Sequence, residues 1–192
     1  MSQTSSTSRV RTIAEIGLTI ALFAVLDYFN VRMPINLAGG SISLSMAPII
    51  VLALFRGPLI GVFAGVLCGG VDLLIAPYAI NVFQVILDYP LAYGAVGLAG
   101  LVKAPLEKAY LEHKKGKVAG LVVAGVLCSA VGRFVFHFLS GVIFFAENTP
   151  AGDSVYVYSA LYQLQYLVPS FVGCGIVCAV VVPALLRYFW SE

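Results

Sequence analysis

Charged side chains are scarce in this sequence. Only 10% of its 192 residues are Asp, Glu, Lys or Arg, whereas roughly 25% is usual in a soluble domain. Hydrophobic residues make up 60%, and the mean hydropathy is +0.99. We therefore predict an integral membrane protein, and a single domain over residues 1–192, because this length allows one compact bundle. The net charge of +2 is too small to indicate a nucleic-acid partner.

Motifs of the common ATPase, hydrolase and metal sites are missing as well. The sequence has no GxxxxGKS or GxxxxGKT loop with which to bind the phosphates of ATP. It has no HExxH or GxSxG motif and only two histidines, so we predict no metal, no cofactor and no catalytic nucleophile. The four cysteines lack CxxC spacing and are expected to be small buried side chains. They are Cys68, Cys128, Cys174 and Cys178.

Long apolar segments are abundant. They predict an all-α bundle of six membrane helices, with a polar tail at residues 1–10 and a charged connection at 103–117. Pro90 is expected to kink the fourth helix, and the second and third helices are so short that neighbours must shield them. The six helices show no internal repeat, whereas paired repeats are common in self-sufficient secondary transporters. The predicted helices cover residues 12–28, 45–55, 58–75, 81–102, 118–145 and 155–189.

The basic residues are distributed unequally between the two sides of the predicted bundle. Six spans place both termini on one side; nine Lys and Arg residues lie on that side, and only Arg32 lies on the other. By the positive-inside rule, both termini are predicted to be cytoplasmic and the loops at 32–43, 76–81 and 147–155 to face outward. The nine basic residues are Arg9, Arg11, Arg56, Lys103, Lys108, Lys114, Lys115, Lys117 and Arg187.

One polar stretch interrupts the apolar pattern at residues 76–90, which read APYAINVFQVILDYP. An ionisable side chain at membrane depth, such as Asp88, indicates a functional site. Helical spacing places Gln84 and Asp88 on one face, with Tyr89 about 100° round. A carboxylate beside phenol rings suits a flat ligand that is cationic or forms hydrogen bonds. Alternatively, Asp88 pairs with a neighbouring helix and the tyrosines form an interfacial belt.

The predicted helix at 118–145 carries Arg133 and His137 on one face at a spacing of four residues. In a functional interpretation His137 hydrogen-bonds a ligand and Phe145 stacks on it. In the alternative, Arg133 neutralises Asp88 or Asp72, and His137 bonds a backbone carbonyl.

The last helix begins with a run of tyrosines and two amides. Helical spacing places Tyr158 and Tyr162 on one side. Gln163 and Gln165 are expected to face protein or a cavity, because an unbonded amide in lipid is costly, but spacing alone does not choose between them. In the first helix, Gly17 and Ala21 form a small-xxx-small pair that would let another helix approach closely.

Several long segments resemble the thiamine-specific substrate-binding (S) subunits of energy-coupling factor vitamin transporters. The resemblance covers nearly the whole chain from Arg11 onward. It is carried by GGSISLSMAPI at 39–49, LFRGPLIGVFAG at 54–65, PYAINVFQVILDYPLAYGAVGLAGL at 77–101, HFLSGVIFF at 137–145 and VYSALY at 157–162.

This resemblance implies a six-helix S subunit in the cell membrane, with its vitamin site near the outer surface. It also implies that Gly17 and Ala21 dock a transmembrane coupling subunit, which in turn contacts two cytoplasmic ATPases. Asp88 would hydrogen-bond or charge-pair with thiamine. The positions implied to contact thiamine are Tyr78, Asp88, Tyr89, His137, Phe145, Tyr158 and Gln163.

The sequence also departs from the family pattern. Phe145 stands where Trp is frequent, Gln163 where Asn is common, and Ser43 and Ser45 where a Glu can appear. One methylene changes discrimination by about 1–3 kcal/mol. The same scaffold could therefore bind a thiamine precursor such as hydroxymethylpyrimidine, or another small aromatic vitamin. A third hypothesis is an intramembrane enzyme that uses Asp88, His137 and Arg133.

Overall fold

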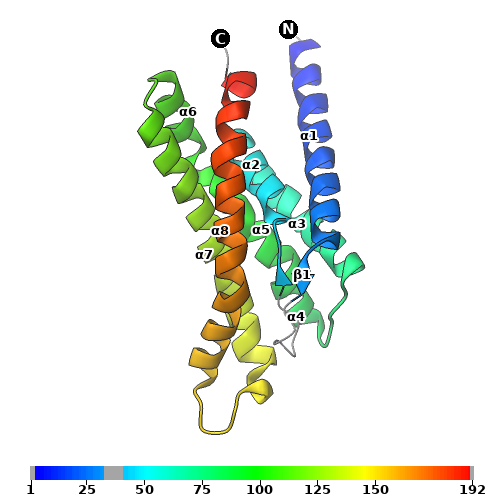
Figure 1. Cartoon of the computed structure of the whole chain (residues 1–192). Coiled ribbons are helices and arrows are strands. Elements are labelled where there is room, and N and C mark those ends of the chain that lie inside the picture. Colours follow the sequence, from blue (N-terminus) through cyan, green and yellow to red (C-terminus); the bar gives the residue numbers. More distant parts are fainter. Residues whose placement is uncertain (1–2, 33–40, 191–192) are drawn as a thin grey trace.

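The computed structural model describes residues 3–32 and 41–190, and it is a bundle of helices joined by short connections (Figure 1). This confirms the all-α class. Four helical segments are long and apolar enough to cross a membrane: Pro58–Ile75, Val82–Leu111, Lys115–Phe144 and Val155–Trp190. The elements are α1 (Gln3–Tyr28), β1 (Val31–Arg32), β2 (Ser41–Ile42), α2 (Met46–Arg56), α3 (Pro58–Ile75), α4 (Val82–Ile86), η1 (Leu87–Leu91), α5 (Ala92–Val96), η2 (Gly97–Val102), α6 (Lys103–Leu111), α7 (Lys115–Phe144), η3 (Ala146–Asn148) and α8 (Val155–Trp190).

The segment around Pro90 stays helical. Pro90 lies in η1, a π-turn in which the Ala92 N–H reaches back five residues to the Leu87 carbonyl. The wider turn accommodates the proline, which has no N–H to donate. Helical backbone therefore continues from α4 through η2 into α6.

Two predicted boundaries are wrong. The charged connection at 103–117 is mostly helical, because α6 extends to Leu111 and α7 begins at Lys115, so that only a turn remains. The polar tail at 1–10 is also helical from Gln3, because α1 extends N-terminally from its apolar part. An i,i+4 pair, Arg11 Nε to Glu15 Oε1 at 3.1 Å, supports this polar half of α1.

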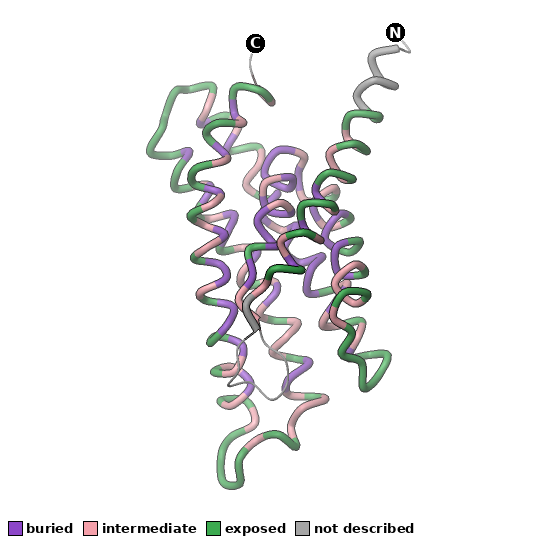
Figure 2. The backbone as a smooth tube through the Cα atoms, turned by 45° about the vertical axis from the view of Figure 1, so that its right-hand side comes forward, coloured by how far each residue is buried: buried purple, intermediate pink, exposed green. Residues whose placement is uncertain are grey.

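The short helix α2 lies at the centre of the bundle. Eight of its 11 residues are buried, and Figure 2 shows the buried part of the chain concentrated around it while the outer faces of α1 and α8 remain exposed. Neighbouring helices therefore shield α2, as expected for an apolar helix too short to span a membrane.

Helix α3 packs directly on the backbone of the segment that follows α4. A Cβ built on Gly65 would lie 2.2 Å from the Tyr93 carbonyl oxygen, and one built on Gly97 would lie 2.1 Å from the Val62 nitrogen. Any larger residue at these two positions would push the helices apart. This contact fixes the position of the segment that carries Asp88.

An ionic and aromatic cluster joins the helices at the end of the bundle where α1 begins and α8 ends (Figure 1). Arg56 binds Glu15 through two hydrogen bonds of 2.6 and 2.7 Å. Phe55 stacks on Phe189 with ring centroids 4.3 Å apart, and the Arg11 guanidinium lies 4.7 Å from the Tyr188 ring centroid. These contacts connect α1, α2 and α8 at the end of the bundle that lies away from the polar stretch.

Candidate functional site

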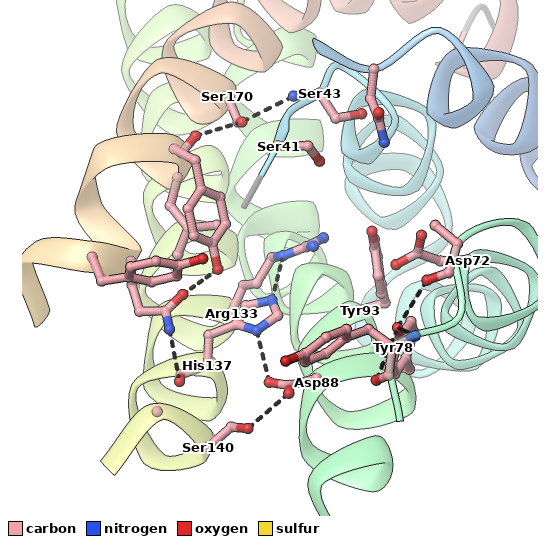
Figure 3. A pocket seen from close by; sticks show the side chains of 18 of the residues that line it. Ser41, Ser43, Asp72, Tyr78, Asp88, Tyr93, Arg133, His137, Ser140 and Ser170 are labelled. Carbon is pink, nitrogen blue, oxygen red and sulfur yellow. Dashed lines mark hydrogen bonds and ion pairs between the residues drawn. The ribbon is translucent and has the colours of Figure 1, made fainter. Parts of the chain in front are cut away.

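A cavity of about 540 Å³ lies among α3, η1, α7 and α8, within the range usual for small-molecule pockets. All seven residues predicted to contact a ligand line it: Tyr78, Asp88, Tyr89, His137, Phe145, Tyr158 and Gln163. Figure 3 shows side chains from these separate elements turned toward a common space.

Asp88 takes part in three hydrogen bonds at the cavity wall. Its Oδ2 accepts hydrogen bonds from Gln84 Nε2 at 2.6 Å and from Ser140 Oγ at 2.8 Å, and its Oδ1 lies 3.0 Å from His137 Nδ1. Three donors from two elements favour the ionised carboxylate. They also hold its two oxygens in a fixed direction at the cavity wall (Figure 3).

The contacts of His137 define its tautomer. Arg133 Nε donates to His137 Nε2 at 3.1 Å, and an arginine keeps its hydrogens in proteins. Nε2 must therefore accept, the imidazole is neutral, and its hydrogen on Nδ1 is donated to Asp88. Arg133 therefore reaches Asp88 only through His137. The alternative was that Arg133 neutralises Asp88 or Asp72. Among the described residues it forms a salt bridge with neither, although its positive charge acts on Asp72. The ring nitrogens of His137 contact Asp88 and Arg133 and not a backbone carbonyl.

Tyr89 lines the cavity but is occupied by the loop before α4. Its hydroxyl donates to the Ala76 carbonyl at 3.1 Å and accepts from the Tyr78 N–H at 2.9 Å. Gln84 adds a bond from its Nε2 to the Tyr78 carbonyl at 3.3 Å. The two side chains thus hold Tyr78 in place, and Tyr89 contributes to the pocket mainly through its ring.

Aromatic rings lie along the rim and wall of the cavity. Tyr78 and Phe145 are nearly parallel, with an interplanar angle of 22° and centroids 6.0 Å apart. Tyr158 and Tyr162 follow on α8, 6.3 Å apart. Flat, electron-rich faces of this kind bind aromatic and cationic groups.

The structure separates the two glutamines of α8. Gln163 is 6% exposed; its Nε2 donates to the His137 carbonyl at 3.2 Å, and its Oε1 accepts from the Tyr166 hydroxyl. Gln165 is exposed and does not line the cavity. Gln163 therefore belongs to the pocket. Its side chain, one methylene longer than that of Asn, bonds both the His137 carbonyl and the Tyr166 hydroxyl.

Sequence reasoning missed several polar residues of the cavity. Ser140 could have been predicted most easily, because it follows His137 by three residues and lies on the same face of the helix. Three further serines, Ser43, Ser45 and Ser170, line the cavity from segments that are distant in the sequence. The Ser43 N–H donates a hydrogen bond to Ser170 Oγ at 3.1 Å. Only the fold brings these together.

Gly17 and Ala21 lie apart from the cavity, on an exposed face of α1. Nothing lies within 4 Å of a Cβ built on Gly17, so this face is open to another helix. In the described part of the chain, no group of three or more His, Cys, Asp or Glu side chains could hold a metal ion.

The fold and the cavity together define a class: a helical membrane protein that encloses a small-molecule pocket lined by aromatic and hydrogen-bonding side chains. A family model described as "Thiamine transporter protein (Thia_YuaJ)" matches residues 13–190. The chain belongs to this thiamine transporter family, which confirms the prediction from resemblance.

Known proteins agree with this assignment. The thiamine transporter ThiT of Bacillus subtilis (strain 168) is 33% identical over 177 residues, covering 90% of this chain and 92% of ThiT. ThiT of Lacticaseibacillus paracasei is 36% identical over 120 residues, 60% of each chain. The solved structure of ThiT from Listeria monocytogenes has the same fold, with a TM-score of 0.75 at 24% identity over 94% of this chain and 96% of that one. The relatives are transporters, so the protein is a membrane transport protein and not an enzyme.

Proposed function

We propose that this chain is the substrate-binding (S) subunit of an energy-coupling factor importer, and that its cavity captures thiamine. The observation that carries the proposal is the partly buried Asp88, held by three hydrogen bonds, in a cavity lined by nearly parallel aromatic rings. Thiamine has a flat aminopyrimidine ring, which needs directed hydrogen bonds, and a cationic thiazolium ring, which suits tyrosine faces. The names of the relatives support this ligand.

The orientation of the site follows from charge. Apart from Arg133, nine of the ten Lys and Arg residues belong to the end of the bundle that holds both termini, which supports cytoplasmic termini. The loop at 76–81, whose Tyr78 lines the cavity, is then outside the cell. The pocket would therefore collect its ligand from the exterior.

Import against a gradient needs an energy source that this chain does not carry, since no phosphate-binding loop occurs in it. We assign this role to a transmembrane coupling subunit with two cytoplasmic ATPases. The open face of α1 at Gly17 and Ala21 is the proposed docking surface, because small residues let a second membrane helix approach closely.

Titration of the purified protein with thiamine tests the ligand. Binding should quench tyrosine fluorescence, whereas Trp190, which packs on Phe55 at the opposite end, should not respond. A competition series with hydroxymethylpyrimidine and other small aromatic vitamins separates thiamine from its precursor. Failure of thiamine to bind, or stronger competition by the precursor, would contradict the assignment.

A further inference from the structure

A groove of about 470 Å³ lies between α7 and α8, which run side by side (Figure 1). The residues that line it lie between Val122 and Phe134 on α7 and between Leu164 and Gly175 on α8, and they consist of Val, Leu, Ala, Phe and Gly. Leu167 is shared with the lining of the cavity, and the other lining residues are not. The groove is therefore a separate and wholly apolar hollow.

The groove opens outward from the bundle. Val126 and Phe171 are buried and form its floor, whereas Leu127, Val131 and Val172 on its walls are more than half exposed. Water finds no hydrogen-bond partner on such a surface, and an empty hollow would deprive the lining of dispersion contacts. The occupant must therefore be apolar, and it must reach the groove from the membrane.

The length of the groove fits one leaflet of a bilayer. From Val122 to Phe134 it follows α7 for about 18 Å at 1.5 Å per residue, and half of a hydrocarbon core is about 15 Å thick. A membrane-spanning helix of a partner would need a seat through both leaflets. Such helices also approach each other through small residues, whereas the exposed walls here are Val and Leu. These dimensions favour a lipid acyl chain.

A basic side chain lies beyond one end of the groove. Lys115 precedes Val122 by seven residues, so it lies on the same side of α7, about 10 Å further along the helix. Gly116 and Ala119, between them, are exposed, and nothing lies within 4 Å of a Cβ built on Gly116. Within the described part of the chain, Lys115 is exposed and forms no salt bridge.

The opposite end of the α7–α8 pair has the opposite charge. The connection between the two helices, residues 145–154, contains Glu147 and Asp153 and neither Lys nor Arg. An anionic headgroup would be repelled there and attracted at Lys115. This difference in charge gives the lipid a direction, with its chain in the groove and its phosphate at the end of the bundle that holds the termini.

We propose that the groove between α7 and α8 seats an acyl chain of an anionic phospholipid, and that Lys115 binds the phosphate of its headgroup. The site goes beyond the proposed function. Only the name of the leaflet, the cytoplasmic one, rests on the orientation proposed above. A lysine at the membrane surface favours an anionic lipid by about fivefold, so the headgroup provides the selectivity and the groove provides the seat.

The first experiment tests the headgroup. Native mass spectrometry at pH 7 measures the binding of phosphatidylglycerol and phosphatidylcholine with identical chains to the purified protein. The parent should prefer phosphatidylglycerol by about fivefold or more, and Lys115→Gln should reduce that preference about fivefold. Lys117→Gln is the matched control, because Lys117 lies about 200° round the helix from Lys115 and is equally free of salt bridges among the described residues. Equal losses in both variants, or no preference in the parent, would overturn the headgroup site.

The second experiment tests the groove. Ala130→Phe places a ring in the groove and should cause the loss of both bound lipids, whereas Ala184→Phe, on an exposed position of α8 outside the lining, should not. Unchanged lipid binding in Ala130→Phe would overturn the proposal. If Ala130→Phe instead prevented assembly with the coupling subunit while both lipids stayed bound, the groove would seat a helix of that subunit and the lipid assignment would be wrong.

Thiamine affinity is measured for the same variants. It should stay within about twofold of the parent, because none of the substituted residues lines the cavity, and this also shows that the variants are folded. A parent that bound no thiamine but kept its preference for phosphatidylglycerol would contradict the proposed function and leave the lipid site standing.

Discussion

The end of the bundle that holds the termini and the end that holds the cavity bury very different groups. Near the termini, stacked rings and a two-bond ion pair join α1, α2 and α8. Around the cavity, two carboxyl groups, a guanidinium, an imidazole and several hydroxyls are partly or fully buried. Buried polar networks contribute little net stability compared with apolar packing. The first end therefore stabilises the fold, whereas the second holds the polar groups of the proposed ligand site.

The largest expected effect tests the packed part. Gly97→Ala places a Cβ 2.1 Å from the Val62 nitrogen, and α3 must move away from η2. We expect a loss of about 3 kcal/mol in the free energy of unfolding, or failure to fold. The control Gly120→Ala adds a Cβ with nothing within 4 Å and should be neutral or slightly stabilising. Thermal unfolding in detergent measures both, and similar melting temperatures would contradict the close packing.

The next effect tests the cavity. Asp88→Asn replaces an oxygen that accepts hydrogen bonds with an amide that opposes the donors Gln84 and Ser140. Thiamine binding should weaken by about 2–5 kcal/mol, while the unfolding temperature changes much less. Asp153→Asn, on an exposed loop residue, is the matched control. Calorimetry would contradict the role of Asp88 if both variants bound thiamine as the parent does.

A smaller effect tests the rim of the cavity. Phe145→Ala removes the ring that is nearly parallel to Tyr78 and should cost about 1–1.5 kcal/mol of thiamine affinity. Phe144→Ala changes the neighbouring position, which does not line the cavity, and should leave affinity unchanged. Fluorescence titration distinguishes the two, and equal losses would show that the effect is not local to the rim.

The smallest effect returns to the terminal end. Arg56→Gln breaks the ion pair to Glu15, whose side chains are 21% and 18% exposed. Partial exposure limits the expected loss of unfolding free energy to about 1 kcal/mol, and thiamine affinity should not change. An altered affinity would show that the two ends of the bundle are coupled, contrary to the division described above.

The contrast between the two ends also explains what the sequence could predict. Apolar runs placed the helices and the i,i+4 pairs placed Gln84 beside Asp88, because both patterns are local. The helical path through Pro90 was not predictable, since a π-turn and a kink begin from the same residue. The continuation into α6 was missed because its composition is that of a charged loop.

Residues of the cavity divide in the same way. His137 and Ser140 share one face of α7 and could be read from spacing, whereas the approach of Ser43 to Ser170 spans 127 residues and depends on tertiary packing. The contacts of the predicted residues with thiamine stay a prediction until the ligand is tested.

The loop held by Tyr89 and Gln84 has a consequence for the kinetics of capture. Its backbone is fastened to α4 and η1 by hydrogen bonds that exist before any ligand arrives. This loop forms part of the cavity wall and loses little conformational freedom when a ligand binds. Preorganisation of this kind acts mainly on the dissociation rate of the ligand. Tyr89→Phe should therefore shorten the residence time of the ligand, although its hydroxyl is bonded to the loop backbone.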